Sequence, residues 1–134
     1  MADALQLEIV TPAKMVVNDV AEEIQIPGKS GYLGILPGHA PLISELAVGE
    51  ITYRNSSGAH YLAVAWGFAE VLPEKVTILA ETAERPSEIN VQRAQDAKQR
   101  AEQQLKSGDP NLDYLHVEAA LQRAETRLQV AEKK

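Results

Sequence analysis

Cysteine is absent from this 134-residue chain, and aromatic side chains are scarce, with one Trp, one Phe and four Tyr. The absence of Cys excludes disulfides, thiolate catalysis and Cys-based metal sites. The scarcity of aromatic residues leaves Val, Ile, Leu and Ala to build the core. The longest apolar run covers only residues 61–69, far short of the roughly 20 residues that a membrane-spanning helix needs. We therefore expect a globular chain of one domain, or one domain with an appendage.

Positive charge is also in short supply. The net charge of −6 argues against nucleic acid or anionic lipid as a partner, because both attract clustered positive charge. Residues 1–84 hold four Lys or Arg against eleven Asp or Glu, whereas residues 85–134 hold nine against eight. An anion is therefore expected to bind only in the second half. Residues 1–4 show no signal-peptide pattern, so any membrane association is expected to run through another protein.

The first half of the chain alternates apolar and polar residues, which is the period of a strand with one face in water. The alternation is clearest in residues 5–9, 22–26 and 76–79. Turn signals separate such stretches at Thr11-Pro12, Pro27-Gly28, Pro37-Gly38, Asn55 to Gly58 and Leu72 to Lys75. Short strands without helices between them predict an antiparallel β-sandwich or flattened barrel over residues 1–84.

The second half has the period of a helix. After Arg85-Pro86, Ser87 is the predicted N-cap of a first helix. Gly108 would end that helix, and Asp109 would cap the second one, followed by Pro110 in its first turn. The predicted apolar faces are Val91, Ala94, Ala97, Ala101 and Leu105, then Tyr114, Val117, Leu121, Ala124, Leu128 and Ala131. Residues 85–134 are thus expected to form an antiparallel two-helix hairpin.

An Ala-rich seam buries little apolar surface, and short isolated helices are marginal in water. The hairpin is therefore expected to be movable or to depend on a partner.

Residue types that could carry out catalysis or bind a metal are scattered along the chain. His39, His60 and His116 lack the spacing of metal ligands. No nucleophile-elbow motif occurs, and no pair of carboxylates is marked as acid and base. The glycines between 28 and 38 lack the Lys-Ser/Thr ending of a phosphate-binding loop and are expected in turns. We predict no catalytic residue, no metal site and no required cofactor.

Four arginines of the second half allow two interpretations. Arg93 and Arg100 lie two turns apart on the first helix, and Arg123 and Arg127 lie one turn apart on the second. They are either a solvated face, with Asp96 pairing with Arg100, or a cluster facing one cleft, which suits a polyphosphate. Spacing alone favours the solvated face.

Three segments resemble the epsilon subunits of bacterial F-type (rotary) ATP synthases. Residues 26–43 carry Ile-Pro-Gly-Lys-Ser-Gly-Tyr-Leu-Gly-Ile-Leu-Pro-Gly-His-Ala-Pro-Leu-Ile, which is similar to the signature of that family. Residues 65–71 resemble its Gly-Phe-x-Glu-Val strand, with Trp66 at a position where a small residue is common. Residues 76–85 resemble the strand and linker that end its sandwich. With the hairpin, the resemblance covers nearly the whole chain.

The resemblance implies a non-enzymatic subunit, peripheral on the cytoplasmic side of the cell (inner) membrane and attached only through its complex. Its sandwich would bind the gamma subunit and the c-ring, so that proton-driven rotation reaches the alpha/beta catalytic head. Its hairpin would be compact or extended, and would block ATP hydrolysis when extended. Tyr32 replaces an acid found in some relatives. The implied partner contacts are Ser30, Gly31, Tyr32, His39, Ala40 and Pro41.

Residues 89–94, Ile-Asn-Val-Gln-Arg-Ala, resemble the Ile/Leu-Asp-x-x-Arg-Ala motif with which many relatives bind ATP. The resemblance implies ATP as a regulatory ligand of Glu84, Ile89, Asn90, Arg93, Ala94, Arg100, Arg123 and Arg127. Asn90 replaces the acid of the motif. Its amide oxygen would still accept a hydrogen bond from an adenine amino group, without the strengthening that a charge gives.

Two other functions remain as alternatives. The first is an adapter or chaperone-like protein that joins a β-domain to a helical hairpin outside any ATP synthase. The second is a small β-fold enzyme, for which the strands offer no convergent polar cluster.

Overall fold

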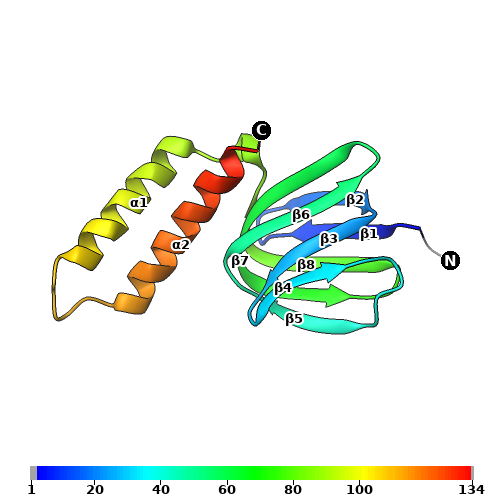
Figure 1. Ribbon diagram of the computed structural model, residues 1–134, viewed down its shortest axis with the longest axis horizontal. Coiled ribbons are helices and arrows are strands. Elements are labelled where there is room, and N and C mark those ends of the chain that lie inside the picture. The colour runs from blue at the N-terminus through cyan, green and yellow to red at the C-terminus, as the bar shows by residue number, and fades with distance from the viewer. Residues whose placement is uncertain (1–2, 134) are drawn as a thin grey trace.

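The computed structural model describes residues 3–133 and has a β-sandwich beside a two-helix hairpin (Figure 1). The strands are β1 (Leu5–Val10), β2 (Met15–Ala21), β3 (Glu23–Gly28), β4 (Gly31–Ile35), β5 (Leu42–Leu46), β6 (Gly49–Asn55), β7 (Gly58–Val71) and β8 (Lys75–Glu84). A 3₁₀ turn, η1 (Pro86–Glu88), leads to α1 (Val91–Lys106) and α2 (Tyr114–Ala131). The predicted sandwich followed by a helical hairpin is confirmed.

The strands form two layers that share the long strand β7. One layer runs β2-β1-β8-β7-β5, while β6 pairs with the first half of β7 and continues through β3 to β4. All pairs are antiparallel except β1 with β8, which are parallel in register from Gln6 opposite Lys75 to Val10 opposite Leu79. A parallel pair needs a long connection, and here the whole of β2 to β7 provides it. The expectation of a wholly antiparallel sheet therefore fails at this one pair.

β7 passes from one layer to the other through a kink at Trp66 and Gly67. Up to Val64 it pairs with β6, and from Gly67 onward it pairs with β5. Both kink residues have positive φ, 54° at Trp66 and 127° at Gly67. A Cβ atom at position 67 would lie 1.8 Å from the carbonyl oxygen of Leu79, so only glycine allows this approach of the two backbones.

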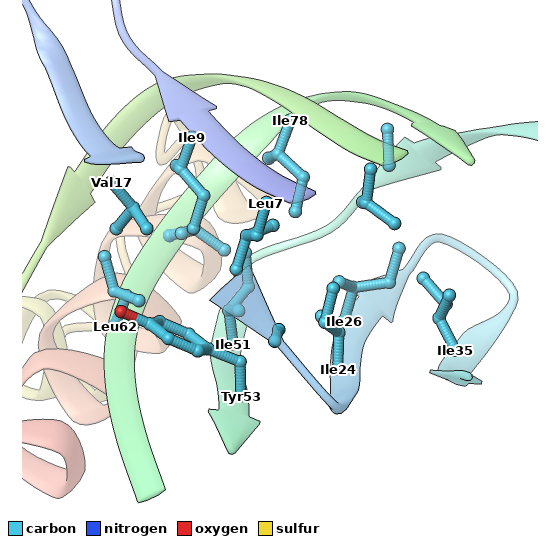
Figure 2. Packing of buried hydrophobic residues seen from close by; sticks show 14 of the residues in the cluster. Leu7, Ile9, Val17, Ile24, Ile26, Ile35, Ile51, Tyr53, Leu62 and Ile78 are labelled. Atoms are coloured by element: carbon cyan, nitrogen blue, oxygen red, sulfur yellow. The ribbon is translucent and has the colours of Figure 1, made fainter. Parts of the chain in front are cut away.

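The space between the layers is filled by aliphatic side chains (Figure 2). Leu7, Ile24, Ile51 and Ile78 are fully buried there, as the alternation of the strands predicts. The core positions of β7 change phase at the kink, because even-numbered Leu62 and Val64 precede it and odd-numbered Ala69 and Val71 follow it. The kink thus lets one strand serve two layers.

The helices begin later than the sequence predicts. Ser87 lies within η1, and the N-cap of α1 is Asn90, whose Oδ1 accepts a hydrogen bond from the backbone N–H of Arg93. The N-cap of α2 is Asp113 and not Asp109. Asp109 instead accepts a hydrogen bond from the N–H of Asn111 and stabilises the turn before the helix. The observed N-caps differ from the predicted ones because a short turn precedes each helix. Ser87 and Asp109 are residue types that suit a turn as well as an N-cap.

The hairpin rests on the sandwich mainly through α2, with the linker residue Ile89 and Val91 of α1 packed at the same contact. α2 lies between α1 and the sandwich and packs on β6 and β7 (Figure 1). The buried residues of this contact form a small cluster of Ala63, Ile89, Val130 and Ala131, separate from the main core. Among the described residues, no helix is long and apolar enough to cross a membrane.

Candidate functional site

A groove of about 760 Å³ lies between α1 and α2. It brings together the residues for which ATP binding is predicted, with one exception. Its lining includes Glu84, Asn90, Arg93, Ala94, Arg100, Arg123 and Arg127. The two pairs of arginines, one from each helix, therefore face a common space.

The groove carries an excess of positive charge. Its four arginines are accompanied by the carboxylates of Asp96 and Glu84. In the described part of the chain Asp96 forms no ion pair with Arg100, and it accepts a hydrogen bond from Gln92 Nε2 at 2.9 Å. Within residues 3–133, no carboxylate oxygen lies within 4.0 Å of the guanidinium of Arg93 or Arg100. Several guanidiniums around one hollow suit an anion with several oxygens.

The two arginines of α2 are held by the sandwich. Arg127 Nε lies 2.5 Å from Glu84 Oε1, and both side chains are 31% exposed. The guanidinium carbon of Arg123 lies 4.9 Å from the centroid of the Trp66 ring, within the range of a cation–π contact. Trp66 was not among the predicted site residues. The only signal for it in the sequence is that it departs from the pattern that residues 65–71 otherwise resemble.

Asn90, which lines the groove, has a structural role as the N-cap of α1. Its only side-chain oxygen accepts a hydrogen bond from the backbone N–H of Arg93, at 3.0 Å. The oxygen that was expected to meet an adenine amino group thus already accepts one hydrogen bond in the helix cap, and one lone pair is left for a ligand. An Asp would have a second oxygen left for a ligand.

Ile89 is the one residue predicted to bind ATP that does not line the groove. Its side chain is 6% exposed and packs with Ala63, Val130 and Ala131. It follows η1 directly and is the apolar residue by which the linker enters the contact between hairpin and sandwich.

The linker between β8 and α1 is tied to the turn between β1 and β2. Lys14 Nζ lies 2.8 Å from Glu88 Oε2, and Glu88 Oε1 accepts a hydrogen bond from the N–H of Arg85 at 2.9 Å. The hydrogen bond from Lys14 and that from the Arg85 backbone hold the pKa of Glu88 below its ordinary value. η1 is thus fixed to the sandwich before the chain reaches the groove.

The predicted partner-contact residues fall into two groups at opposite ends of β4. Ser30, Gly31 and Tyr32 lie at the turn between β3 and β4, and residues 39–41 lie in the loop between β4 and β5. A strand of this length separates the two groups by about 16 Å. Tyr32 is 62% exposed, yet its hydroxyl accepts a hydrogen bond from the N–H of Glu50 at 3.1 Å. The two groups are therefore separate surfaces.

A third surface is the outer face of β5, β7 and β8. Ile43, Phe68 and Leu79 are 73%, 54% and 55% exposed, and Phe68 lies directly opposite Leu79 in the sheet. Large apolar side chains gathered on one exposed face mark an interaction surface more often than a bare exterior.

Comparison with known proteins gives the family. Residues 4–86 match the model of the ATP synthase delta/epsilon chain beta-sandwich domain, and residues 87–132 match that of its long alpha-helix domain. The chain is 69% identical over 110 residues to the ATP synthase epsilon chain of Koribacter versatilis, covering 82% of this chain and 78% of that one. It is 47% identical over 133 residues to the epsilon chain of Syntrophobacter fumaroxidans, covering 99% of both.

Solved structures show the same fold. A chain in the Euglena gracilis mitochondrial ATP synthase, in a structure of OSCP, F1 and c-ring, matches with a TM-score of 0.83 at 23% identity, over 98% of this chain and 83% of that one. A chain in the central stalk and c-ring of the Tetrahymena thermophila enzyme matches with a TM-score of 0.56. With both family models matched in order along its length, this chain belongs to the ATP synthase delta/epsilon chain family.

Proposed function

We propose that this chain is a non-catalytic subunit of the rotor stalk in a proton-translocating F-type ATP synthase, where it passes rotation to the catalytic head and restrains ATP hydrolysis. The observation that carries this proposal is the division of the molecule into a sandwich with its own core and a hairpin that rests on it through four buried residues. A part that transmits torque must be rigid, and a part that switches must be detachable.

The sandwich is the part that binds the rotor. Its apolar outer face, with Ile43, Phe68 and Leu79, suits a large contact with the gamma subunit. The two exposed groups at the ends of β4 suit smaller contacts, and we assign the c-ring to one of them. The complex would hold the chain at the cytoplasmic side of the cell membrane, without direct contact with lipid.

The hairpin is the brake. Leaving the sandwich would expose the small cluster around Ala63 and Val130 and would break the contacts of Arg123 and Arg127. These are few interactions, so a competing surface on the gamma subunit or the alpha/beta head can replace them. The extended hairpin would then oppose rotation in the direction of ATP hydrolysis.

ATP is the regulatory ligand that we assign to the groove. The arginines of both helices line it, and a triphosphate that bridges them would relieve the repulsion between Arg123 and Arg127. A ligand that recognises only the compact hairpin shifts the population toward it. ATP would thus release the brake when it is abundant.

Removal of residues 87–134 tests the brake. We expect ATP synthesis to stay coupled to proton flow, while ATP hydrolysis by the detached catalytic head rises severalfold at low nucleotide concentration. A shortened chain of residues 1–86 should remain folded by circular dichroism and should bind the gamma subunit. Unchanged hydrolysis would contradict the restraint of ATP hydrolysis by the hairpin. A shortened chain that is unfolded, or that fails to bind the gamma subunit, would contradict the division of the molecule into two parts.

Co-purification separates this function from that of an adapter outside the synthase. Pull-down of the whole chain from native membranes should recover the large synthase subunits. Their absence, with other proteins recovered in their place, would favour the adapter.

A further inference from the structure

Trp66 occupies an unusual place in the sandwich. It is the only Trp of the chain, and it has the only positive φ among the non-glycine residues that the structure describes. It lies at the kink where β7 leaves β6, one residue after the buried Ala65, and it remains 37% exposed. A bulky residue is disfavoured in the left-handed region of backbone conformation. The kink therefore holds the Trp66 ring at the face of the sandwich although the residue itself prefers negative φ.

The neighbour of the ring is Arg123, which also lines the groove between the helices. A guanidinium stacked on an aromatic ring is held by its flat face. Its N–H donors all lie in the plane, so they remain free for phosphate oxygens. One side chain can therefore contact the sandwich and a ligand of the groove at the same time.

Arg127 repeats this arrangement one turn further along α2. It pairs with Glu84 at the end of β8 and lines the same groove. Arg93 and Arg100, in contrast, lie on α1, whose main packing partner is α2. Half of the cationic lining is thus positioned by the sandwich and half by the hairpin alone.

We propose that Trp66 is a positioning residue of the anion groove: its ring fixes the Arg123 guanidinium, so that the groove is complete only while α2 is docked on the sandwich. This inference rests on the proposed binding of a nucleoside triphosphate and adds the residue that couples binding to docking. A ligand held by Arg123 strengthens the docked state, and undocking weakens the ligand site by the same factor.

The test is isothermal titration of the full chain with ATP. The natural chain is compared with the single variants Trp66→Ala, Trp66→Phe and Arg123→Lys, and with the double variant that combines Trp66→Ala with Arg123→Lys. Tyr114→Ala, which removes an exposed aromatic residue at the start of α2, is the matched control. We expect Trp66→Ala to weaken binding by about three- to tenfold. Trp66→Phe should retain most of the affinity because its ring remains, and Tyr114→Ala should leave the affinity unchanged.

The double variant gives the readout that a purely structural role of Trp66 would not produce. Lys keeps the charge but loses both the planar contact with the ring and the fork of donors, so Arg123→Lys should cost clearly less affinity in Trp66→Ala than in the natural chain. Hydrogen exchange without ligand should show faster exchange of the second half of α2 in Trp66→Ala, and circular dichroism should show the same strand content.

The outcomes separate this inference from the function on which it rests. If the natural chain binds ATP and Trp66→Ala binds equally well, or if the losses from Trp66→Ala and Arg123→Lys simply add, Trp66 does not position Arg123. If the natural chain and Asn90→Asp both fail to bind ATP at millimolar concentration, the groove is not a nucleotide site, and the assignment to Trp66 is lost together with it.

Discussion

The sandwich and the hairpin are stabilised in different ways. The sandwich encloses nineteen buried residues in one cluster, most of them branched aliphatic residues contributed by strands far apart in sequence. The contact between hairpin and sandwich buries a cluster of four, of which two are Ala. Because apolar burial stabilises at about 25 cal/mol per Å², we expect the first region to hold its shape alone and the second to depend on its contacts. The chain would then combine a rigid part with one that binding partners can move.

The largest expected effect comes from a cavity in the sandwich. Ile78→Ala removes a fully buried side chain and should lower the free energy of unfolding by about 2–5 kcal/mol. Val130→Ala, which is equally buried but lies in the hairpin contact, is the matched variant. It should leave the main urea transition of the sandwich almost unchanged and loosen only α2.

Urea denaturation followed by circular dichroism, together with hydrogen exchange along α2, measures the two effects. Equal loss from both variants in a single transition would mean that sandwich and hairpin unfold as one unit, and the comparison between them would fail.

The next effect concerns the charges of the groove. Arg93→Ala and Arg127→Ala should each weaken ATP binding by about 1.5–3 kcal/mol, the range of a lost charged hydrogen bond. Arg127→Ala should in addition loosen α2, because it leaves Glu84 without its partner. Lys98→Ala, on α1 outside the groove lining, is the control. If titration calorimetry finds that all three variants bind ATP as the natural chain does, the arginines form a solvated face and not a binding site.

A smaller gain in affinity is expected from Asn90→Asp. One carboxylate oxygen would keep the cap on the Arg93 N–H, and the other would accept a hydrogen bond from the ligand with charge assistance. The difference between a charged and a neutral hydrogen bond is about 1 kcal/mol, or roughly fivefold in affinity. Asn90→Ser, which keeps the cap alone, is the control. If Asn90→Asp restores binding that the natural chain lacks, the substitution at position 90 has disabled the site.

Sequence reasoning predicted the parts of the fold that depend on local pattern. The alternation in β1 indicates a half-buried strand because Leu5, Leu7 and Ile9 fill the core while the residues between them face outward. The three- and four-residue spacing of the helices likewise predicts the buried Ala94 and Ala101. These patterns arise from a single element meeting a single apolar surface, so one sequence is enough to see them.

What sequence reasoning missed depends on how elements meet. Periodicity identifies a strand but not its neighbour, so it gave no indication that β1 pairs in parallel with β8. The apolar alternation of β7 is interrupted at Trp66 and Gly67, where the backbone has positive φ. Periodicity alone does not show that this interruption is a kink that places Trp66 beside Arg123. Ile89 lies next to the motif residue Asn90, yet it packs into the hairpin contact. The groove itself was predicted only as arginine spacing, because its shape requires both helices.

The smallest expected effect is a pH dependence of the linker that joins the two regions. Lys14, through its hydrogen bond, and then the N–H of Arg85 hold the pKa of Glu88 below its ordinary value of 4.5. A carboxyl whose pKa is lower in the folded state stabilises the fold above its unfolded pKa, and this contribution is lost as the pH falls through the folded value. The pair is partly exposed, with side chains 58% and 34% accessible, so solvent limits the effect to about 0.2–1 kcal/mol.

The backbone amides of residues 86–94 should therefore be better protected from hydrogen exchange at pH 6 than below pH 4. Protection is the intrinsic exchange rate relative to the measured rate at the same pH. Lys14→Ala should remove most of this difference, and Lys14→Arg should keep it because the charge remains. The core amides of the sandwich should show neither change, since Lys14 and Glu88 both lie outside the main cluster. If Lys14→Ala exchanges like the natural chain at both pH values, the ion pair does not hold the linker, and the packing of Ile89 holds it instead.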